Sequence, residues 1–287
     1  MRVRAGSAGL GTYLIFYFGL PLFGALCLGW SLIALPARLL LPPRAGAVLG
    51  RRGICRGFRW YLAVMVRVGA IKLDTRALEE LAQESSVVLA PNHPGLFDAI
   101  LLLAYHPDMV CIMKSAMLRN PFLGPGARLA RFIGNAAPRR MIGEAVAAVR
   151  SGAALLLFPE GTRTVRNPVN RFQLTVGTIA KHAQAPILTL LIETDSPYLS
   201  KGWPLFRVPS LPITYRVRLG RRFAPPRDVR RFTRELEQYF RAELDHSTLN
   251  SWLPGHVGSH APRHPAPRGA TEVEAPEVST SRTGSLP

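Results

Sequence analysis

The feature that most constrains this chain is an uncharged apolar segment near its N-terminus. Residues 5–37 contain no charged side chain, and Tyr13–Leu35 is a run of 23 residues dominated by Leu, Phe, Ile, Ala and Gly. About 20 apolar residues suffice to cross a bilayer, so the segment predicts a membrane anchor. A cleaved signal peptide is the alternative, but the run is long for one, and Leu-Leu-Leu-Pro-Pro-Arg follows it instead of a small-residue cleavage site.

The sequence allows two membrane topologies for this segment. Pro21 and the glycines at 19, 24 and 29 could divide it into two arms that enter the membrane and return, or it forms a single span. Two arginines precede it, whereas residues 38–59 contain six. The positive-inside rule then places the rest of the chain in the cytoplasm, on the cytoplasmic (inner) membrane.

Charge and motifs narrow the function classes. The formal net charge is +18, and 32 of the 36 cationic residues are Arg, which favours a polyanionic partner such as phospholipid headgroups, a phosphorylated substrate or nucleic acid. The three cysteines are far apart in sequence, which excludes a disulfide scaffold and a CxxC site. The signatures GxxxxGK[ST], GxGxxG, HExxH and GxSxG are all missing.

The sequence as a whole predicts three parts: a membrane anchor over 1–45, a catalytic domain over 46–253 and a disordered Pro/Ser/Gly-rich tail over 254–287. Residues 56–73 combine aromatic, Arg and aliphatic side chains, and form either an amphipathic helix at the headgroup level or a helix packed on the core. Strands alternating with helices indicate an α/β domain with a mostly parallel sheet flanked by helices. The strand-like runs are 87–90, 111–113, 153–158, 187–192 and 213–219, and the helical ones are 98–105, 142–149, 174–183 and 229–244.

The first candidate site is Asn92-His93-Pro94-Gly95-Leu96-Phe97-Asp98. The preceding strand delivers His93 to a sheet edge, where ligands of open α/β sheets bind. A residue before proline avoids helical geometry, so His93 is expected in an extended loop, with Asp98 in the first turn of a helix. The carboxylate then reaches back to the imidazole, which gives a general base with an orienting acid, although an ordinary turn would also use these residue types.

The second candidate site is Phe158-Pro159-Glu160-Gly161-Thr162-Arg163-Thr164, directly after another strand. Backbone N–H groups at a Gly turn, together with a hydroxyl and a guanidinium, suit a phosphate. The alternative is a plain strand-to-loop turn, with Arg163 solvated and Glu160 bonded to backbone.

HPGLFD and FPEGTR, about 65 residues apart, resemble motifs I and III of the glycerolipid acyltransferases, and the match is closest to the bacterial 1-acyl-sn-glycerol-3-phosphate type. Gly134-Asn135-Ala136-Ala137-Pro138-Arg139-Arg140 resembles motif II, with Arg140 at the expected spacing and Arg139 as a near rival. Ala185-Pro186-Ile187 resembles motif IV. Two departures lie near the expected acceptor site: motif II lacks an aliphatic-Asp run, and Gln173 stands in a region where the family has Phe-Lys.

The resemblance implies a membrane-bound acyltransferase that moves a fatty acyl group from acyl carrier protein or coenzyme A to a lysophospholipid hydroxyl. It implies His93 and Asp98 as catalytic residues, and substrate binding by a further group: Glu160, Gly161, Thr162, Arg163, Arg140 and Arg139. Membrane phospholipids, the lysolipid acceptor and the thioester donor are the expected partners, with no cofactor, metal or nucleic acid. The alternatives are an acyltransferase of specialised lipid metabolism with another acceptor, and a non-catalytic basic protein that binds membrane or nucleic acid.

Overall fold

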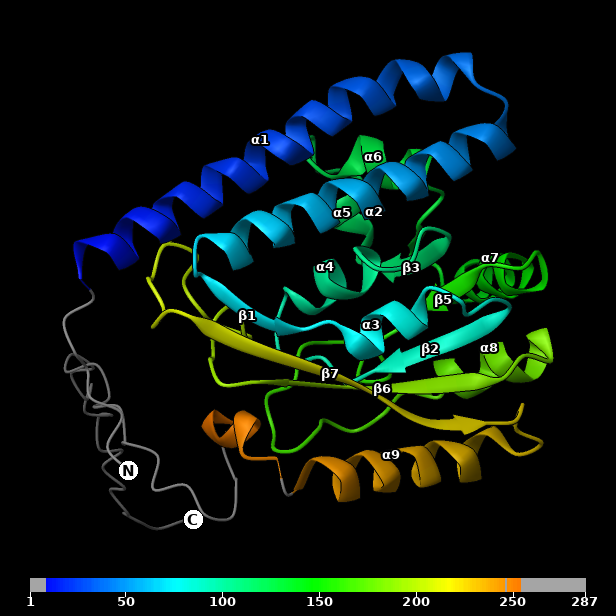
Figure 1. Ribbon diagram of the computed structural model, residues 1–287. Coiled ribbons are helices and arrows are strands. Elements are labelled where there is room, and N and C mark those ends of the chain that lie inside the picture. Colours follow the sequence, from blue (N-terminus) through cyan, green and yellow to red (C-terminus); the bar gives the residue numbers. More distant parts are fainter. Residues whose placement is uncertain (1–8, 246, 254–287) are drawn as a thin grey trace, which may run out of the picture.

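A seven-stranded sheet organises the computed structural model, which describes residues 9–245 and 247–253 (Figure 1). Its strand order is β1-β7-β6-β2-β5-β3-β4, and every neighbouring pair is parallel except β6 and β7. The predicted α/β class with a mostly parallel sheet is therefore confirmed. The strands are β1 (Ile71–Asp74), β2 (Val87–Pro91), β3 (Met109–Met113), β4 (Ile133–Gly134), β5 (Ala154–Leu156), β6 (Ile187–Thr194) and β7 (Ile213–Phe223).

Burial explains why the central strands are continuous apolar runs. Every residue of β2, β5 and β6 is buried, as expected for parallel strands covered on both faces. Strand β7 instead begins with an alternation in which Ile213, Tyr215 and Val217 point into the core. The predicted strands at 87–90, 111–113, 153–158, 187–192 and 213–219 are all present, with ends shifted by a few residues.

Helices cover both faces of the sheet and create two core layers. One layer joins the sheet to α2, α3 and α4 through side chains such as Leu62, Leu78 and Leu101. The other joins it to α7, α8 and α9, with Ile179 and Phe240 fully buried there. The helices of the domain are α3 (Arg76–Leu81), α4 (Asp98–Leu103), α5 (Ser115–Leu118), α6 (Gly124–Leu129), α7 (Pro138–Arg150), α8 (Thr175–Ala183) and α9 (Val229–Asp245), with a 3-10 turn at Leu249–Trp252.

The N-terminal apolar segment forms one long helix, α1 (Leu10–Leu40), which runs beside α2 (Pro43–Arg67). The helix continues through Pro21, so the two-armed alternative within this segment is wrong. A proline removes one backbone hydrogen bond, but α1 packs against α2 on both sides of Pro21, with Gly19 against Met65 and Phe23 against Phe58.

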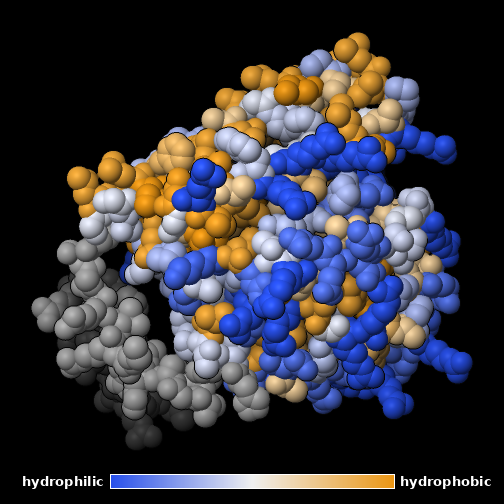
Figure 2. Space-filling view, viewed as in Figure 1, coloured by the Kyte–Doolittle hydropathy of each residue, from blue (hydrophilic) through white to orange (hydrophobic). Residues whose placement is uncertain are grey.

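Helix α1 is long and apolar enough to cross a membrane, and only 22% of its most apolar window is buried inside the molecule. Figure 2 shows hydrophobic residues gathered along α1, above a domain whose surface is largely hydrophilic. An ordinary core helix would have hidden these side chains, so the exposed apolar surface suits contact with lipid.

The segment 56–73 divides between two elements. Residues 56–67 end α2, whose Tyr61, Leu62 and Met65 pack on the core, which favours the core-helix alternative. The helical prediction is wrong after Arg67, because residues 68–70 form a turn and the residues from Ile71 form β1, which pairs with β7. The predicted tail 254–287 lies outside the described residues.

Candidate active site

The loop after β2 places His93 at the carboxyl edge of the sheet. The preceding Asn92 is buried and bonds to β6 through both ends of its amide: Nδ2 donates to the Ile192 carbonyl at 2.8 Å, and Oδ1 accepts from the Ile192 N–H at 2.7 Å. The loop therefore leaves the sheet in a fixed direction, and His93 follows directly.

His93 and Asp98 are in contact as the sequence predicts. Asp98 is the first residue of α4, and its Oδ2 lies 2.8 Å from His93 Nδ1. The same oxygen accepts the Gly95 N–H at 2.8 Å. The imidazole stacks on Phe158, with ring centroids 3.8 Å apart, and its side chain stays 13% exposed. With Nδ1 directed at the carboxylate, Nε2 is the ring nitrogen placed to exchange a proton with a substrate.

Asp98 is completely buried, which shapes its electrostatics. Burial raises the pKa of Asp98, while the hydrogen bonds from His93 and the Gly95 N–H favour its ionised form and oppose that rise. Its second oxygen, Oδ1, has no hydrogen-bond partner among the described residues. The carboxylate is thus held by one oxygen in a site without solvent, where its attraction for an imidazolium is strong.

Glu160 joins the two motifs from inside the protein. Its Oε1 accepts the His93 N–H at 2.9 Å and the Thr164 hydroxyl at 2.7 Å, and its Oε2 accepts the Asn170 N–H at 2.9 Å. A further bond runs from the Thr164 N–H to the His93 carbonyl at 2.7 Å. Because Glu160 is buried and accepts three protein donors, its carboxylate fixes the backbone of His93.

The turn that follows Glu160 faces outward. Gly161 is exposed with φ +66°, a left-handed conformation that favours glycine, and Thr162 is half-buried. The Arg163 guanidinium crosses to another segment, where Nη1 donates to the carbonyls of Leu199 at 2.8 Å and Ser200 at 2.9 Å. These three residues thus lie together beside His93, at the ends of β2 and β5, which are neighbouring parallel strands.

Known proteins share the motifs that build this geometry. A family model described as Acyltransferase matches residues 72–193, which include both motifs. Over these residues the chain is similar to the acyltransferase family. It is 24% identical over 180 residues to a 1-acyl-sn-glycerol-3-phosphate acyltransferase of Pseudomonas aeruginosa, covering 61% of this chain and 68% of that protein. The alternative of a non-catalytic basic protein is therefore wrong.

A solved structure shares the fold of this acyltransferase. The 1-acyl-sn-glycerophosphate (LPA) acyltransferase PlsC of Thermotoga maritima superposes with a TM-score of 0.61 at 18% identity, over 82% of this chain and 93% of that one. The match therefore extends well beyond the span of the family model.

The motif II arginines of the acyltransferase stand apart from these contacts. Arg139 and Arg140 are exposed in the first turn of α7, and Arg140 Nε donates to Glu144 one turn later at 2.7 Å, with its side chain 79% exposed. Helix α7 follows β4, whose carboxyl end lies on the same edge of the sheet as that of β2, because β2, β5, β3 and β4 are mutually parallel. Both arginines therefore start from the edge that carries His93.

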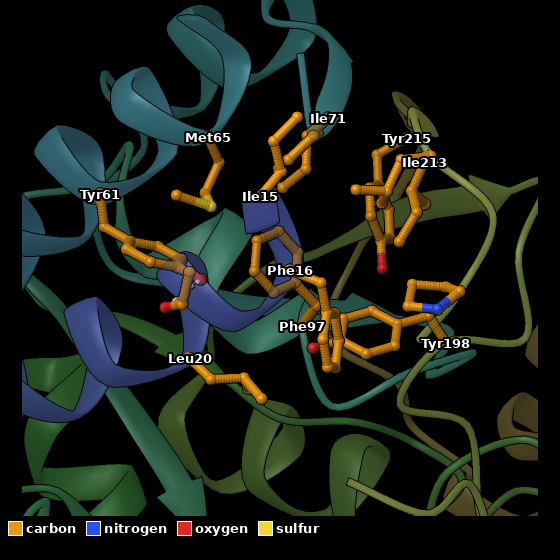
Figure 3. A pocket seen from close by; sticks show the side chains of 14 residues that line it. Ile15, Phe16, Leu20, Tyr61, Met65, Ile71, Phe97, Tyr198, Ile213 and Tyr215 are labelled. Carbon is orange, nitrogen blue, oxygen red and sulfur yellow. Dashed lines mark hydrogen bonds between the residues drawn. The ribbon is translucent and has the colours of Figure 1, made fainter. Parts of the chain in front are cut away.

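An apolar cavity adjoins the His93 loop of the acyltransferase. It lies between α1, α2, β1 and β7, and its free space is about 40 Å³. Figure 3 shows Phe16 of α1, Phe97 of the loop and Tyr198 lying close together at its centre, with Met65 and Tyr215 around them. Phe97 immediately precedes Asp98, so the cavity and the catalytic candidates share one segment.

Sequence reasoning missed the backbone partners of the site. Leu199 and Ser200 receive Arg163 through carbonyl groups, which every residue has, so no side-chain signal marks them. Asn170 closes the Glu160 network and also bonds to the Arg163 carbonyl through Nδ2 at 3.0 Å. Its only signal is its position a few residues after FPEGTR.

Proposed function

We propose that this protein is a membrane-bound acyltransferase that converts 1-acyl-sn-glycerol 3-phosphate to phosphatidic acid. The acyl group would come from the thioester of acyl carrier protein or coenzyme A. The observation that carries the proposal is the 2.8 Å contact between His93 and a buried Asp98, fixed against the FPEGTR turn by Glu160. The similarity to a protein named for this acceptor supports the choice of substrate.

The proposed chemistry is direct transfer. His93 Nε2 accepts the proton of the acceptor hydroxyl as that oxygen attacks the thioester carbonyl. Asp98 keeps the imidazole oriented through Nδ1 and stabilises the imidazolium that forms. When the C–S bond breaks, the thiolate leaves and takes the proton from His93, which restores the neutral base. No protein nucleophile takes part in this scheme.

The acceptor phosphate is assigned to the outward turn. Thr162 offers a hydroxyl, and the guanidinium of Arg163 lies in the same region. Within the described residues, only Nη1 of that guanidinium donates to backbone carbonyls, so its other N–H groups can bind a phosphate. A guanidinium can bind phosphate through two parallel hydrogen bonds. Arg140, or its neighbour Arg139, would add a second cation from the same sheet edge. Gly161 leaves room for the ligand at the turn. The scheme needs no metal or further cofactor.

The proposed location is the cytoplasmic face of the inner membrane. Helix α1 supplies the apolar anchor, and α2 carries arginines that anionic headgroups attract. Acyl carrier protein and coenzyme A thioesters are then available on the side where the site lies.

A different acceptor is the second candidate. Two observations favour it. Arg140 is exposed and already paired with Glu144. Gln173 lies in a region where the acyltransferases that the sequence resembles have Phe-Lys. Such an enzyme would use the same base but bind another hydroxyl- or amine-bearing lipid.

Product analysis separates these candidates. Purified protein is offered acyl-CoA or acyl carrier protein thioesters with lysophosphatidate, glycerol 3-phosphate and a lysolipid without a phosphomonoester, and products are identified by mass spectrometry. Phosphatidic acid as the main product, absent with His93→Ala, is the expected result. Transfer only to an acceptor without the phosphomonoester would support the second candidate.

A further inference from the structure

The connection between β6 and β7 is unusually long. It spans residues 195–212, whereas most connections in compact domains have about four to six residues, and loops beyond about 12–15 are usually functional. Its middle part, Tyr198–Arg207, is called here the 198–207 segment, and it passes beneath the N-terminal half of α1 (yellow in Figure 1).

The inner side of the 198–207 segment is bonded to the candidate active site. The Leu199 carbonyl accepts the Leu96 N–H at 3.0 Å and Arg163 Nη1 at 2.8 Å. Gly95 also approaches closely, since a Cβ there would lie 3.3 Å from the Tyr198 carbonyl oxygen. The position of the segment thus constrains both the His93 loop and the FPEGTR turn.

The outer side of the 198–207 segment is apolar and exposed. Leu205 is 51% and Phe206 69% exposed. The Tyr17 hydroxyl of α1 donates to the Phe206 carbonyl at 3.4 Å, and the Tyr198 ring packs edge-on against Phe16, with centroids 5.9 Å apart. The exposed apolar surface of α1 therefore continues onto this segment, and continuous apolar patches of this kind mark interaction sites.

The charges on the segment identify the kind of partner. Residues 196–212 contain Lys201 and Arg207 and no acidic residue. The Arg207 guanidinium lies 4.8 Å from the Trp203 ring centroid, and Trp203 Nε1 donates to the Arg207 carbonyl at 3.1 Å. Trp, Phe and Leu combined with cations are typical of segments that lie at the headgroup level of an anionic bilayer.

We propose that the 198–207 segment rests on the surface of an anionic bilayer beside α1, and that this contact sets the position of the His93 loop and of Arg163. The inference rests on the membrane-bound acyl transfer proposed above and adds a second membrane contact that is bonded directly to the reaction site. Its continuity with α1 and its positive charge favour lipid over a second copy of the chain.

Probe accessibility tests the contact. Full-length Phe206→Cys is labelled with an environment-sensitive fluorophore and reconstituted into vesicles of phosphatidylcholine and phosphatidylglycerol; the three native cysteines are buried. Arg234→Cys is the matched control, since it is exposed on α9, across the sheet from α1. Nitroxide-labelled lipid should quench the probe at 206 and iodide the probe at 234. Equal iodide quenching at both sites, or protection of 206 from both quenchers by a second copy, would overturn the proposal.

Kinetics test the connection to the site. In the double variant Leu205→Ser/Phe206→Ser, kcat for an acceptor presented in vesicles, measured at saturating vesicle concentration, should fall about tenfold, while kcat for a short-chain soluble acceptor without vesicles stays unchanged. Arg234→Ser should change neither. A rise in the vesicle KM with unchanged kcat would show a membrane contact that does not position the site, and would refute the connection. If the wild-type protein transfers no acyl group to lysophosphatidate, the proposed function fails separately, and the quenching experiment still decides the membrane contact.

Discussion

Glu160→Gln tests the role that the structure gives to the central carboxylate. The wild-type side chain accepts two donors on Oε1 and the Asn170 N–H on Oε2. Glutamine keeps one oxygen but turns an NH₂ group toward the Asn170 N–H. That buried donor then loses its acceptor, which costs about 1–3 kcal/mol.

Two further contributions determine how much Glu160→Gln changes the free energy of unfolding. The bonds from His93 and Thr164 become neutral and weaken, by about 1 kcal/mol together. Burial raises the pKa of Glu160, so removing its charge also recovers part of a desolvation cost. We expect a net loss of about 2 kcal/mol in the free energy of unfolding, which lowers the Tm by about 4–8 °C in a domain of this size.

The assay combines stability and kinetics on the full-length protein in detergent. Thermal unfolding is followed by tryptophan fluorescence, and kcat and both KM values are measured on the same samples. Because Glu160 holds the His93 backbone, kcat should fall about tenfold, equivalent to about 1.4 kcal/mol, with little change in the acceptor KM. The control Thr164→Val removes a single donor and should lower the Tm by only about 2–4 °C.

One result would refute this reasoning. If Glu160→Gln unfolds at the wild-type temperature and raises only the acceptor KM, the carboxylate contacts the substrate and does not act through the His93 backbone. The substrate-binding role that the resemblance implies for Glu160 would then be the better account.

The remaining predictions concern the base, the guanidinium and the two ends of the chain. His93→Ala should reduce the transfer rate by about 10²–10⁴ and lower the Tm modestly, because the buried Asp98 loses a hydrogen-bond partner, whereas His182→Ala, on the exposed side of α8, should change neither; equal losses of rate in both would exclude His93 as the base. Arg163→Lys should raise the KM for the acceptor more than the KM for the donor, because Lys cannot reproduce two parallel bonds, and equal increases would indicate a structural role. Deleting residues 1–42 should weaken vesicle flotation and leave a salt-sensitive remainder, and binding that persists at high salt would place the anchor elsewhere. Deleting residues 255–287 should leave flotation and activity nearly unchanged.

The helices and strands that depend on residues close together in the sequence could be predicted from the sequence. The apolar run predicted a membrane anchor, with one span or two arms left open, and Asp98 was expected at a helix start because His93 precedes a proline. Continuous apolar runs predicted β2 and β6, since buried parallel strands need apolar side chains on both faces. Each of these inferences uses contacts within one turn or one strand. The prediction of a helix over residues 56–73 was wrong after Arg67. The residues from Ile71 form a short edge strand, which is stabilised by pairing with β7.

The tertiary structure decided how the site is connected. Glu160 lies 67 residues from His93, and their contact depends on β5 pairing beside β2. The partners of Arg163 are carbonyl groups at Leu199 and Ser200, on a loop that returns to the site only because β7 runs antiparallel to β6. Backbone groups have no residue-specific pattern, and strand order is a property of the packed chain. The sequence by itself therefore determined which side chains carry the chemistry, and the fold decided which groups hold them in place.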